Sequence, residues 1–382
     1  MRYIGTQAKG IRLPIINRGD RLAEIVADCI TKAADIGPND IIGITEAIVA
    51  KSQSNYATLG HLTEDIKEKY PDGKIGVVFP ILSRNRFFNI LKGIARGAKE
   101  VYVLLSYPSD EVGNPIMDIR QIDEICDLLP PGPVSAKRFR EIAGDFEHPF
   151  TSVDYISLYE STGAKVYFSQ DPRDILKLTP HVLAADIHTR FLTQSRLKKA
   201  GAQTAYTLSD ILSKPVNGSG FHPEYGVLGS NIATDDSLKL FPRECDKFVL
   251  EVQKEVEARV GVSPHVMVYG DGAFKDPVCG IWELADPVVS PGFTSGLAGQ
   301  PHEIKMKMVA DTRLAGMASE EQEKALKEII RQKAEAGAYD QEGTTPRRYV
   351  DLLGSLCDLV SGSGDKGTPV VLVQGYFDSF AD

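Results

Sequence analysis

Hydrophobic positions follow two different periods along the chain. Apolar residues recur at helical spacing over 21–35, 85–98, 243–260 and a segment that begins at Pro346, which predicts amphipathic helices. Short, continuous apolar runs lie between such segments and predict buried strands. These runs span 41–51, 74–80, 100–108, 180–190, 226–228, 265–269 and 368–376.

The alternation of these elements predicts an α+β (mixed α/β) fold. Over residues 58–107 helix, strand, helix and strand follow one another, as in a layer whose sheet is partly parallel. A chain of 382 residues corresponds to about two domains. We expect residues 1–107 and 221–382 to form the two parts of a core, with 108–220 as an insertion or subdomain.

Composition narrows the class of protein. With 42% hydrophobic and 25% charged residues the chain is typical of globular proteins, and its net charge of −9 argues against broad binding to nucleic acid. No apolar run approaches the roughly 18 residues of a membrane span, and MRYIGTQAKG lacks the apolar segment of a signal peptide. Five scattered cysteines without a Cys-x-x-Cys pair indicate a reducing compartment, so we expect a cytoplasmic protein.

Acidic residues follow two of the predicted strands. Asn231, Asp235 and Asp236 come after 226–228, and Asp271 and Asp276 come after 265–269. Mg²⁺ and Mn²⁺ are held by oxygen ligands, with one or two protein carboxylates beside phosphate oxygens and water. The alternative is that Asp and Gly gather here because turns require them.

Two further segments could bind phosphate. Lys51 follows a predicted buried strand and could act as a point charge, although a solvated lysine is more typical of a strand end. The glycine-rich turn SGSGDKG (361–367) offers backbone N–H groups to an anion. It lacks the Gly-Lys-Ser/Thr ending of a Walker loop.

A second set of residues suggests a metal-dependent hydrolase. Asp186, His188 and Arg190 would face one side if the strand over 180–190 continued, and His222 and Glu224 repeat the i, i+2 spacing. The alternative is structural histidines that bond to their neighbours. Arg84 and Arg86 are either a solvated face or a grip for an anionic substrate.

Four segments together resemble the coenzyme F-420:L-glutamate ligase family, the γ-glutamyl ligases. They are RLPIINRGDRLAEIVAD with NDIIGITEAIVAKS, GVLGSNIATDDS, MVYGDGAFKDP and LLGSLCDLVSGSGDKGTPVVLVQGY, in the family's order. The chain departs at Leu238 where the family has Asn, at Ser52–Ser54 where it has Ala-Glu-Gly, and at Ala273–Lys275, offset by one residue from Phe-Gly-Arg. It is also longer, over 100–220 and 300–345.

The resemblance implies a two-domain γ-glutamyl ligase fold with a large insertion, and a homodimer. The insertion over 108–220 would form the acceptor side of the substrate cleft. It implies a ligase that uses a nucleoside triphosphate, expected to be GTP, with Mg²⁺ or Mn²⁺ and with K⁺ as a further candidate cofactor. A carboxylate would be phosphorylated, and the amine of an amino acid, expected to be L-glutamate, would then form an amide.

The family's site residues carry over only to matching positions. The implied metal ligands are Asp235, Asp271 and Gly272, and the implied nucleotide contacts are Leu13, Pro14, Ile15, Ile16, Lys51, Gly362, Ser363, Gly364, Asp365, Lys366 and Gly367. Candidate catalytic residues are Lys275, Asp276 and Arg190. A non-catalytic nucleotide-binding homologue and the hydrolase stay open as alternatives, as does the acceptor, whether a coenzyme F-420 precursor, a folate or another carboxylate.

Overall fold

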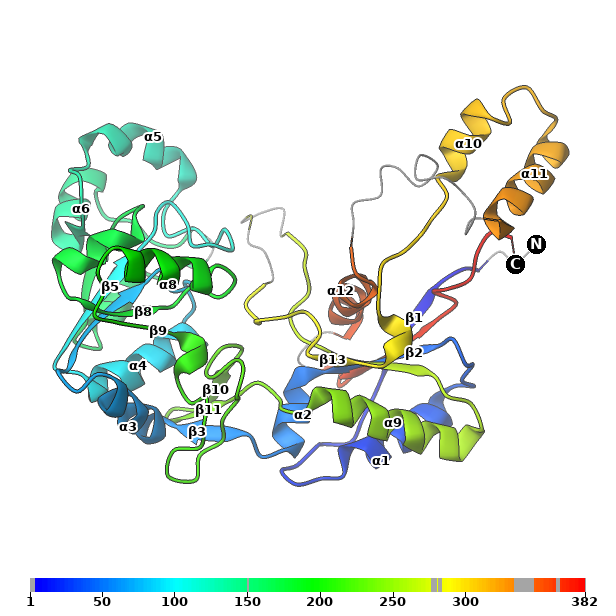
Figure 1. Cartoon of the computed structure of the whole chain (residues 1–382), viewed down its shortest axis with the longest axis horizontal. Coiled ribbons are helices and arrows are strands. Elements are labelled where there is room, and N and C mark those ends of the chain that lie inside the picture. The colour runs from blue at the N-terminus through cyan, green and yellow to red at the C-terminus, as the bar shows by residue number, and fades with distance from the viewer. Residues whose placement is uncertain are drawn as a thin grey trace.

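The computed structural model describes residues 4–149, 151–275, 280, 284–332, 347–361 and 365–381. They form two lobes (Figure 1). The first lobe is built around a five-stranded sheet and contains both the N-terminal and the C-terminal segments; the second is built around a six-stranded sheet. Helices together with several sheets confirm the predicted α+β class.

The first lobe's sheet has the strand order β1-β14-β2-β12-β13. Strands β2 and β12 are parallel, and the other neighbours are antiparallel. Four of the five residues of β2 are buried, as expected for a strand covered on both faces. The bounds are β1 Gln7–Ile11, β2 Ile41–Thr45, β12 His265–Tyr269, β13 Gly292–Phe293 and β14 Val370–Gln374.

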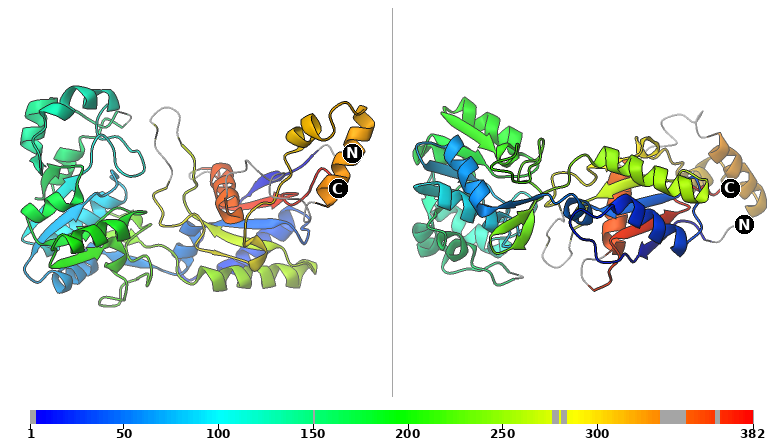
Figure 2. Two further views of the ribbon diagram at one scale, coloured as in Figure 1. Left: turned by 45° about the horizontal axis from the view of Figure 1, so that its top comes forward. Right: turned by 90° about the horizontal axis from the view of Figure 1, so that it is seen from below.

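Helices cover both faces of this sheet. On one face α1 (Leu22–Ala33) and α9 (Cys245–Val260) lie side by side (Figure 2), and Val26 and Val249 share a buried cluster with Ile42. On the other face α12 (Tyr349–Ser361) packs through Leu353 and Cys357. The three helices confirm the predictions made from helical spacing.

The second lobe's sheet has the order β6-β7-β5-β4-β8-β9, parallel except for β6. This confirms the partly parallel layer. Strands β4 and β5 precede residue 107, where we expect a domain boundary, and β6 to β9 follow it. The expected division into 1–107, 108–220 and 221–382 stays a prediction. The bounds are β4 Lys74–Val78, β5 Glu100–Leu105, β6 Val134–Ser135, β7 Lys165–Phe168, β8 His181–Ala184 and β9 Thr204–Thr207.

Two layers of helices enclose the six-stranded sheet. Residues of α3, α4, α6 and α7 share the large cluster that contains Val77 and Val103, while Ile175 and Leu197 pack with Val78 on the opposite face. The bounds are α3 Leu59–Lys69, α4 Phe87–Gly97, α5 Ile122–Ile125, α6 Ala136–Ala143, α7 Tyr155–Glu160, η1 Ile119–Gln121, η2 Cys126–Leu128, η3 Pro172–Lys177, α8 Arg190–Lys199 and η4 Leu208–Asp210.

A small sheet of order β10-β11-β3 lies between the lobes (Figure 1). Its strands are β3 Tyr56–Thr58, β10 Asn231–Thr234 and β11 Ser237–Lys239; the remaining elements are α2 Glu46–Ser52, η5 Ser295–Leu297, α10 Met306–Thr312 and α11 Ser319–Arg331. Over the described ranges, the helices fall short of the length and apolar character of a membrane span.

Three predicted strands differ from the structure. The run 41–51 is a strand only to Thr45, because the helix-forming residues from Glu46 onward continue as α2. The strand predicted over 180–190 ends at Ala184. Asp186, His188 and Arg190 therefore follow the strand and do not share one of its faces. The run 226–228 lies in turns, with Gly226 and Gly229 at φ of 54° and 68°, which glycine adopts without strain.

Candidate functional site

A cleft of about 690 Å³ opens at one edge of the first lobe's sheet. The carboxyl ends of the parallel strands β2 and β12 meet there, and β14 begins beside them because Val370 pairs with Ile44. Ligands of open α/β sheets bind at the carboxyl ends of strands. Its charged and amide side chains are Glu46, Arg86, Asn231, Lys239, Asp271, Asp286 and Asp358, and residues 367–369 before β14 also line it.

The segment Gly270-Asp271-Gly272 directly follows β12, and its first two residues line the cleft. A Cβ added at Gly270 would lie 2.3 Å from Asp286 Oδ2, and one added at Gly272 would lie 2.9 Å from Ser355 Cα, so both positions require glycine. The Asp271 N–H donates to Asp286 Oδ2 at 2.7 Å. The Gly272 N–H donates to Asp358 Oδ2 at 2.9 Å, and burial raises the pKa of Asp358.

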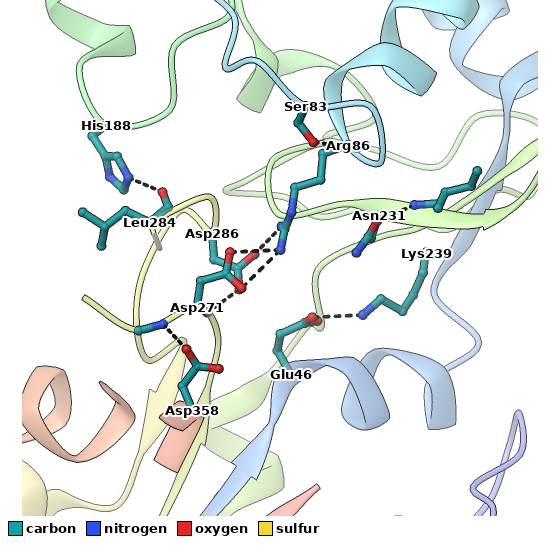
Figure 3. Close-up of polar contacts among 12 residues, drawn as sticks. Glu46, Ser83, Arg86, His188, Asn231, Lys239, Asp271, Leu284, Asp286 and Asp358 are labelled. Atoms are coloured by element: carbon teal, nitrogen blue, oxygen red, sulfur yellow. Dashed lines mark hydrogen bonds and ion pairs between the residues drawn. The ribbon is translucent and has the colours of Figure 1, made fainter. Parts of the chain in front are cut away.

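Arg86 links the two lobes across the cleft (Figure 3). It precedes α4 of the second lobe, and its Nη1 donates to Asp286 Oδ1 at 2.6 Å. Its Nη2 lies 3.2 and 3.0 Å from the two carboxylate oxygens of Asp271. Burial lowers the pKa of the guanidinium, but Asp286 and Asp271 outweigh burial, and the pKa is raised overall.

Glu46 and Lys239 form a second charged pair in the cleft. Lys239 Nζ of β11 donates to Glu46 Oε1 at 2.9 Å, and both side chains are largely buried. Glu46 is the first residue of α2, directly after β2. Burial raises the pKa of Glu46, and Lys239 offsets part of that rise.

The structure brings together two of the segments implied to contact a nucleotide. The Leu13 N–H donates to the Gly367 carbonyl at 3.3 Å, and Gly367 lines the cleft. Pro14 and Ile15 are exposed, whereas Ile16 is buried in the core. Asp365 and Lys366 lie in an exposed turn, and Lys51 lies half-buried in the last turn of α2. Gly362, Ser363 and Gly364 lie outside the described residues.

The two aspartates implied as metal ligands lie in different settings. Asp271 lines the cleft, whereas Asp235 is exposed in the turn between β10 and β11. Within the described part of the chain, no three His, Cys, Asp or Glu side chains form a group that could hold a metal. Mg²⁺ needs only one or two protein carboxylates, so Asp271 and Asp358 with the Gly272 carbonyl fit it in donor chemistry. Asp271 would then share its carboxylate with Arg86.

The candidate catalytic residues are not gathered at the cleft. Arg190 is buried in the second lobe, where its Nε donates to Ser209 Oγ at 2.8 Å and its Nη1 to the Ile187 carbonyl. Lys275 is exposed beside Phe274, which lines the cleft. Asp276 lies outside the described residues. The roles of these three residues stay predictions.

The residues of the hydrolase alternative serve local structure. Both ring nitrogens of His222 are engaged: Nδ1 accepts from the N–H groups of Glu224 and Tyr225, and Nε2 lies 3.1 Å from the Pro242 carbonyl. His188 Nε2 lies 2.6 Å from the Leu284 carbonyl. Asp186 accepts from two threonine hydroxyls. This arrangement favours structural histidines over metal ligands.

Several residues of the cleft were not predicted as site residues. Glu46 was missed because it lies within the run 41–51, which was interpreted as one strand. An acid just after a buried strand is nevertheless the signal that identified Asp271. Asp286 and Asp358 are distant in sequence from β12, and their signal is indirect, since the glycines at 270 and 272 indicate close approach by other chain segments. Lys239 carries no such signal.

One protein family matches this chain. The family model described as F420-0:Gamma-glutamyl ligase matches residues 10–375, nearly the whole chain. The search of curated proteins found no match.

Proposed function

Since the chain belongs to the F420-0:gamma-glutamyl ligase family, we propose that it forms γ-glutamyl-type amide bonds in a reaction that depends on GTP and a divalent metal. The family assigns the class of enzyme, a ligase, and a glutamate-type substrate. GTP, Mg²⁺ or Mn²⁺, an acyl phosphate intermediate and a homodimer are the finer parts of the proposal.

The cleft at the carboxyl ends of β2 and β12 is the observation that supports this proposal. Its volume of about 690 Å³ suits a nucleotide-sized ligand. Carboxylates that follow β12 lie in it together with Gly367, whose carbonyl holds Leu13. Segments from both ends of the sequence therefore meet at one site.

The chemistry that we propose is mostly positioning and charge neutralisation. A bound divalent cation would offset the charge of the triphosphate, as in other phosphoryl transfers. Asp271, Asp358 and the Gly272 carbonyl would hold that cation. Lys51 and the 365–367 turn would neutralise phosphate charge, and Lys275 would stabilise the transferring phosphoryl group.

The variant Asp271→Asn tests the proposal. Asparagine keeps the size of the side chain but removes one ligand charge, so we expect the affinity for GTP in the presence of Mg²⁺ to fall at least about 10-fold. Calorimetry measures that affinity. Asp28→Asn, in an exposed pair with Lys32 on α1, is the matched control and should bind as the wild type does.

Three results would count against this assignment. Unchanged GTP affinity in Asp271→Asn would remove Asp271 from the site. A large drop in melting temperature without metal would make Asp271 a structural turn residue instead. A protein that binds GTP yet yields no product with any carboxylate and amine pair would be a non-catalytic homologue.

A further inference from the structure

Glu46 leaves one buried oxygen of the cleft without a partner. The residue is 8% exposed, and Lys239 occupies its Oε1. Among the described residues, Oε2 has no hydrogen-bond partner. A buried carboxylate oxygen without a donor is costly, so this oxygen would stabilise a donor group that reaches it from the cleft.

The charges around Glu46 favour a cationic donor. Four acids line the cleft, Glu46, Asp271, Asp286 and Asp358, against two bases, Arg86 and Lys239. Both bases are already bonded to these acids. Asp286 and Arg86 are the further charged groups that act on Glu46, in opposite directions. Among the described residues neither base therefore donates to Glu46 Oε2, and this open acceptor suits the N–H donors of an ammonium group.

We propose that Glu46 Oε2 binds the ammonium group of the amino-acid substrate and accepts a proton from it. This rests on the proposed function, because the amine must lose a proton before it can attack an acyl phosphate. Glu46 lines the cleft and Lys239 holds its Oε1 (Figure 3), which leaves Oε2 as the oxygen for a ligand. Burial makes this carboxylate more basic than an exposed one.

The protons and electrons of the step balance. One proton passes from the ammonium group to Glu46, and the freed nitrogen lone pair forms the C–N bond. The C–O bond to phosphate breaks, and the phosphate leaves with that electron pair. A second proton passes from nitrogen to the departing phosphate, and Glu46 releases its proton to water.

Hydroxylamine separates this role from the rest of the reaction. Its nitrogen is largely unprotonated at neutral pH, so it traps an acyl phosphate as a hydroxamate without a protein base. The experiment compares amide formation from L-glutamate with hydroxamate formation, each with GTP, Mg²⁺ and F420-0 as the carboxylate. In Glu46→Gln we expect amide formation to fall about 100-fold or more and hydroxamate formation to stay within about 3-fold.

The pH profile gives a second readout. Amide formation by Glu46→Gln should rise about 10-fold per pH unit above neutrality, because solvent must then deprotonate the amine, whereas the wild type should level off. The glutamine side chain of this variant can still accept from Lys239, and unchanged GTP affinity verifies that the site is intact. If Glu46→Gln does not fold, Glu46→Asp keeps the carboxylate and should retain part of the amide formation.

The control is Glu68→Gln, which makes the same change in an exposed pair with Lys214 and should leave both products unchanged. Equal losses of amide and hydroxamate, or no loss of either, in Glu46→Gln would overturn the inference. Loss of Mg²⁺-dependent GTP binding would place Glu46 at the cation instead and would also overturn it. A wild-type protein that yields neither product would refute the proposed function itself, and the inference with it.

Discussion

His222 illustrates how burial sets the chemistry of one residue. Its ring is packed against Tyr225 and Phe241, and burial lowers its pKa to about 4. Because Nδ1 accepts from two N–H groups, Nε2 carries the single proton of the neutral ring. The folded state therefore excludes a proton that the unfolded chain binds below its usual pKa of 6.5.

This exclusion predicts a pH dependence of stability. The folded pKa is depressed, so the stabilisation is present above pH 6.5 and is lost as the pH falls towards about 4. The slope from this one group is at most about 1.4 kcal/mol per pH unit. In His222→Gln, which keeps an acceptor for the two N–H groups, urea unfolding should depend less on pH over that window. Identical slopes in both proteins would show that His222 is not the group responsible.

At the scale of residues, only part of the cleft's acidic lining could be predicted from the sequence. Asp271 could be predicted because an acid directly after an apolar strand lies at a strand end, and the structure places it in the cleft. Asp235 follows the same pattern by composition, but 226–228 forms turns, so that acid ends in an exposed hairpin turn. Asp286 and Asp358 reach the cleft through tertiary packing, which no local pattern encodes.

At the scale of elements, β2 and α12 pack closely against each other at one glycine. A Cβ added at Gly43 would lie 2.5 Å from Cys357 Sγ and 3.3 Å from Cys357 Cβ. Both residues are buried where α12 covers this face of the sheet. The helix can therefore lie against the strand only while position 43 lacks a side chain.

We expect Gly43→Ala to destabilise the fold by about 1–3 kcal/mol, because the methyl group overpacks this contact. Adding Cys357→Ala removes the sulfur atom, so the double variant should recover at least about 0.5 kcal/mol relative to the sum of the single changes. Denaturant unfolding of the four proteins measures this coupling.

Gly60→Ala is the matched control for that series. Gly60 is exposed in α3, and an added Cβ would meet only Thr58 Oγ1, at 3.4 Å. Alanine is the better helix former, so this change should be neutral or stabilising. Strictly additive effects of Gly43→Ala and Cys357→Ala would mean that β2 and α12 do not pack as described.

Whether a segment forms a helix or a strand could be predicted from the sequence where its apolar pattern was long. The helices α1, α4, α9 and α12 were predicted because their apolar stripes span three turns or more. The strand over 41–51 was extended too far, since Ile48 and Val49 of α2 continue the apolar run of β2. A short apolar run has the same composition in a buried strand and in a buried helix, so the change at Glu46 leaves no clear trace.

At the scale of the whole molecule, Arg86 is a charged link between the lobes. It brings one guanidinium from the second lobe to Asp271 and Asp286 of the first, and Asp286 is only 3% exposed. Which distant segments meet here could not be predicted from the sequence, because the meeting depends on how two separately packed sheets are oriented.

We expect Arg86→Met to destabilise the protein by about 3 kcal/mol, because it leaves the buried carboxylate of Asp286 without its counter-charge. Arg96→Met is the control: it lies at the other end of α4 in an exposed pair with Asp236, and its loss should cost no more than about 1 kcal/mol. Denaturant unfolding compares the two variants. Equal effects would show that the Arg86 contacts do not hold the lobes together.

The transfer of oxygen from the acceptor to phosphate tests the central claim most directly. The protein is incubated with GTP, Mn²⁺, L-glutamate and F420-0 labelled with ¹⁸O in its carboxylate, and mass spectrometry follows the amide and the released phosphate. An acyl phosphate intermediate predicts GDP, a glutamyl amide and one ¹⁸O atom in the phosphate for each amide formed. An amide accompanied by unlabelled phosphate, or GTP hydrolysis without any amide, would contradict the proposed function.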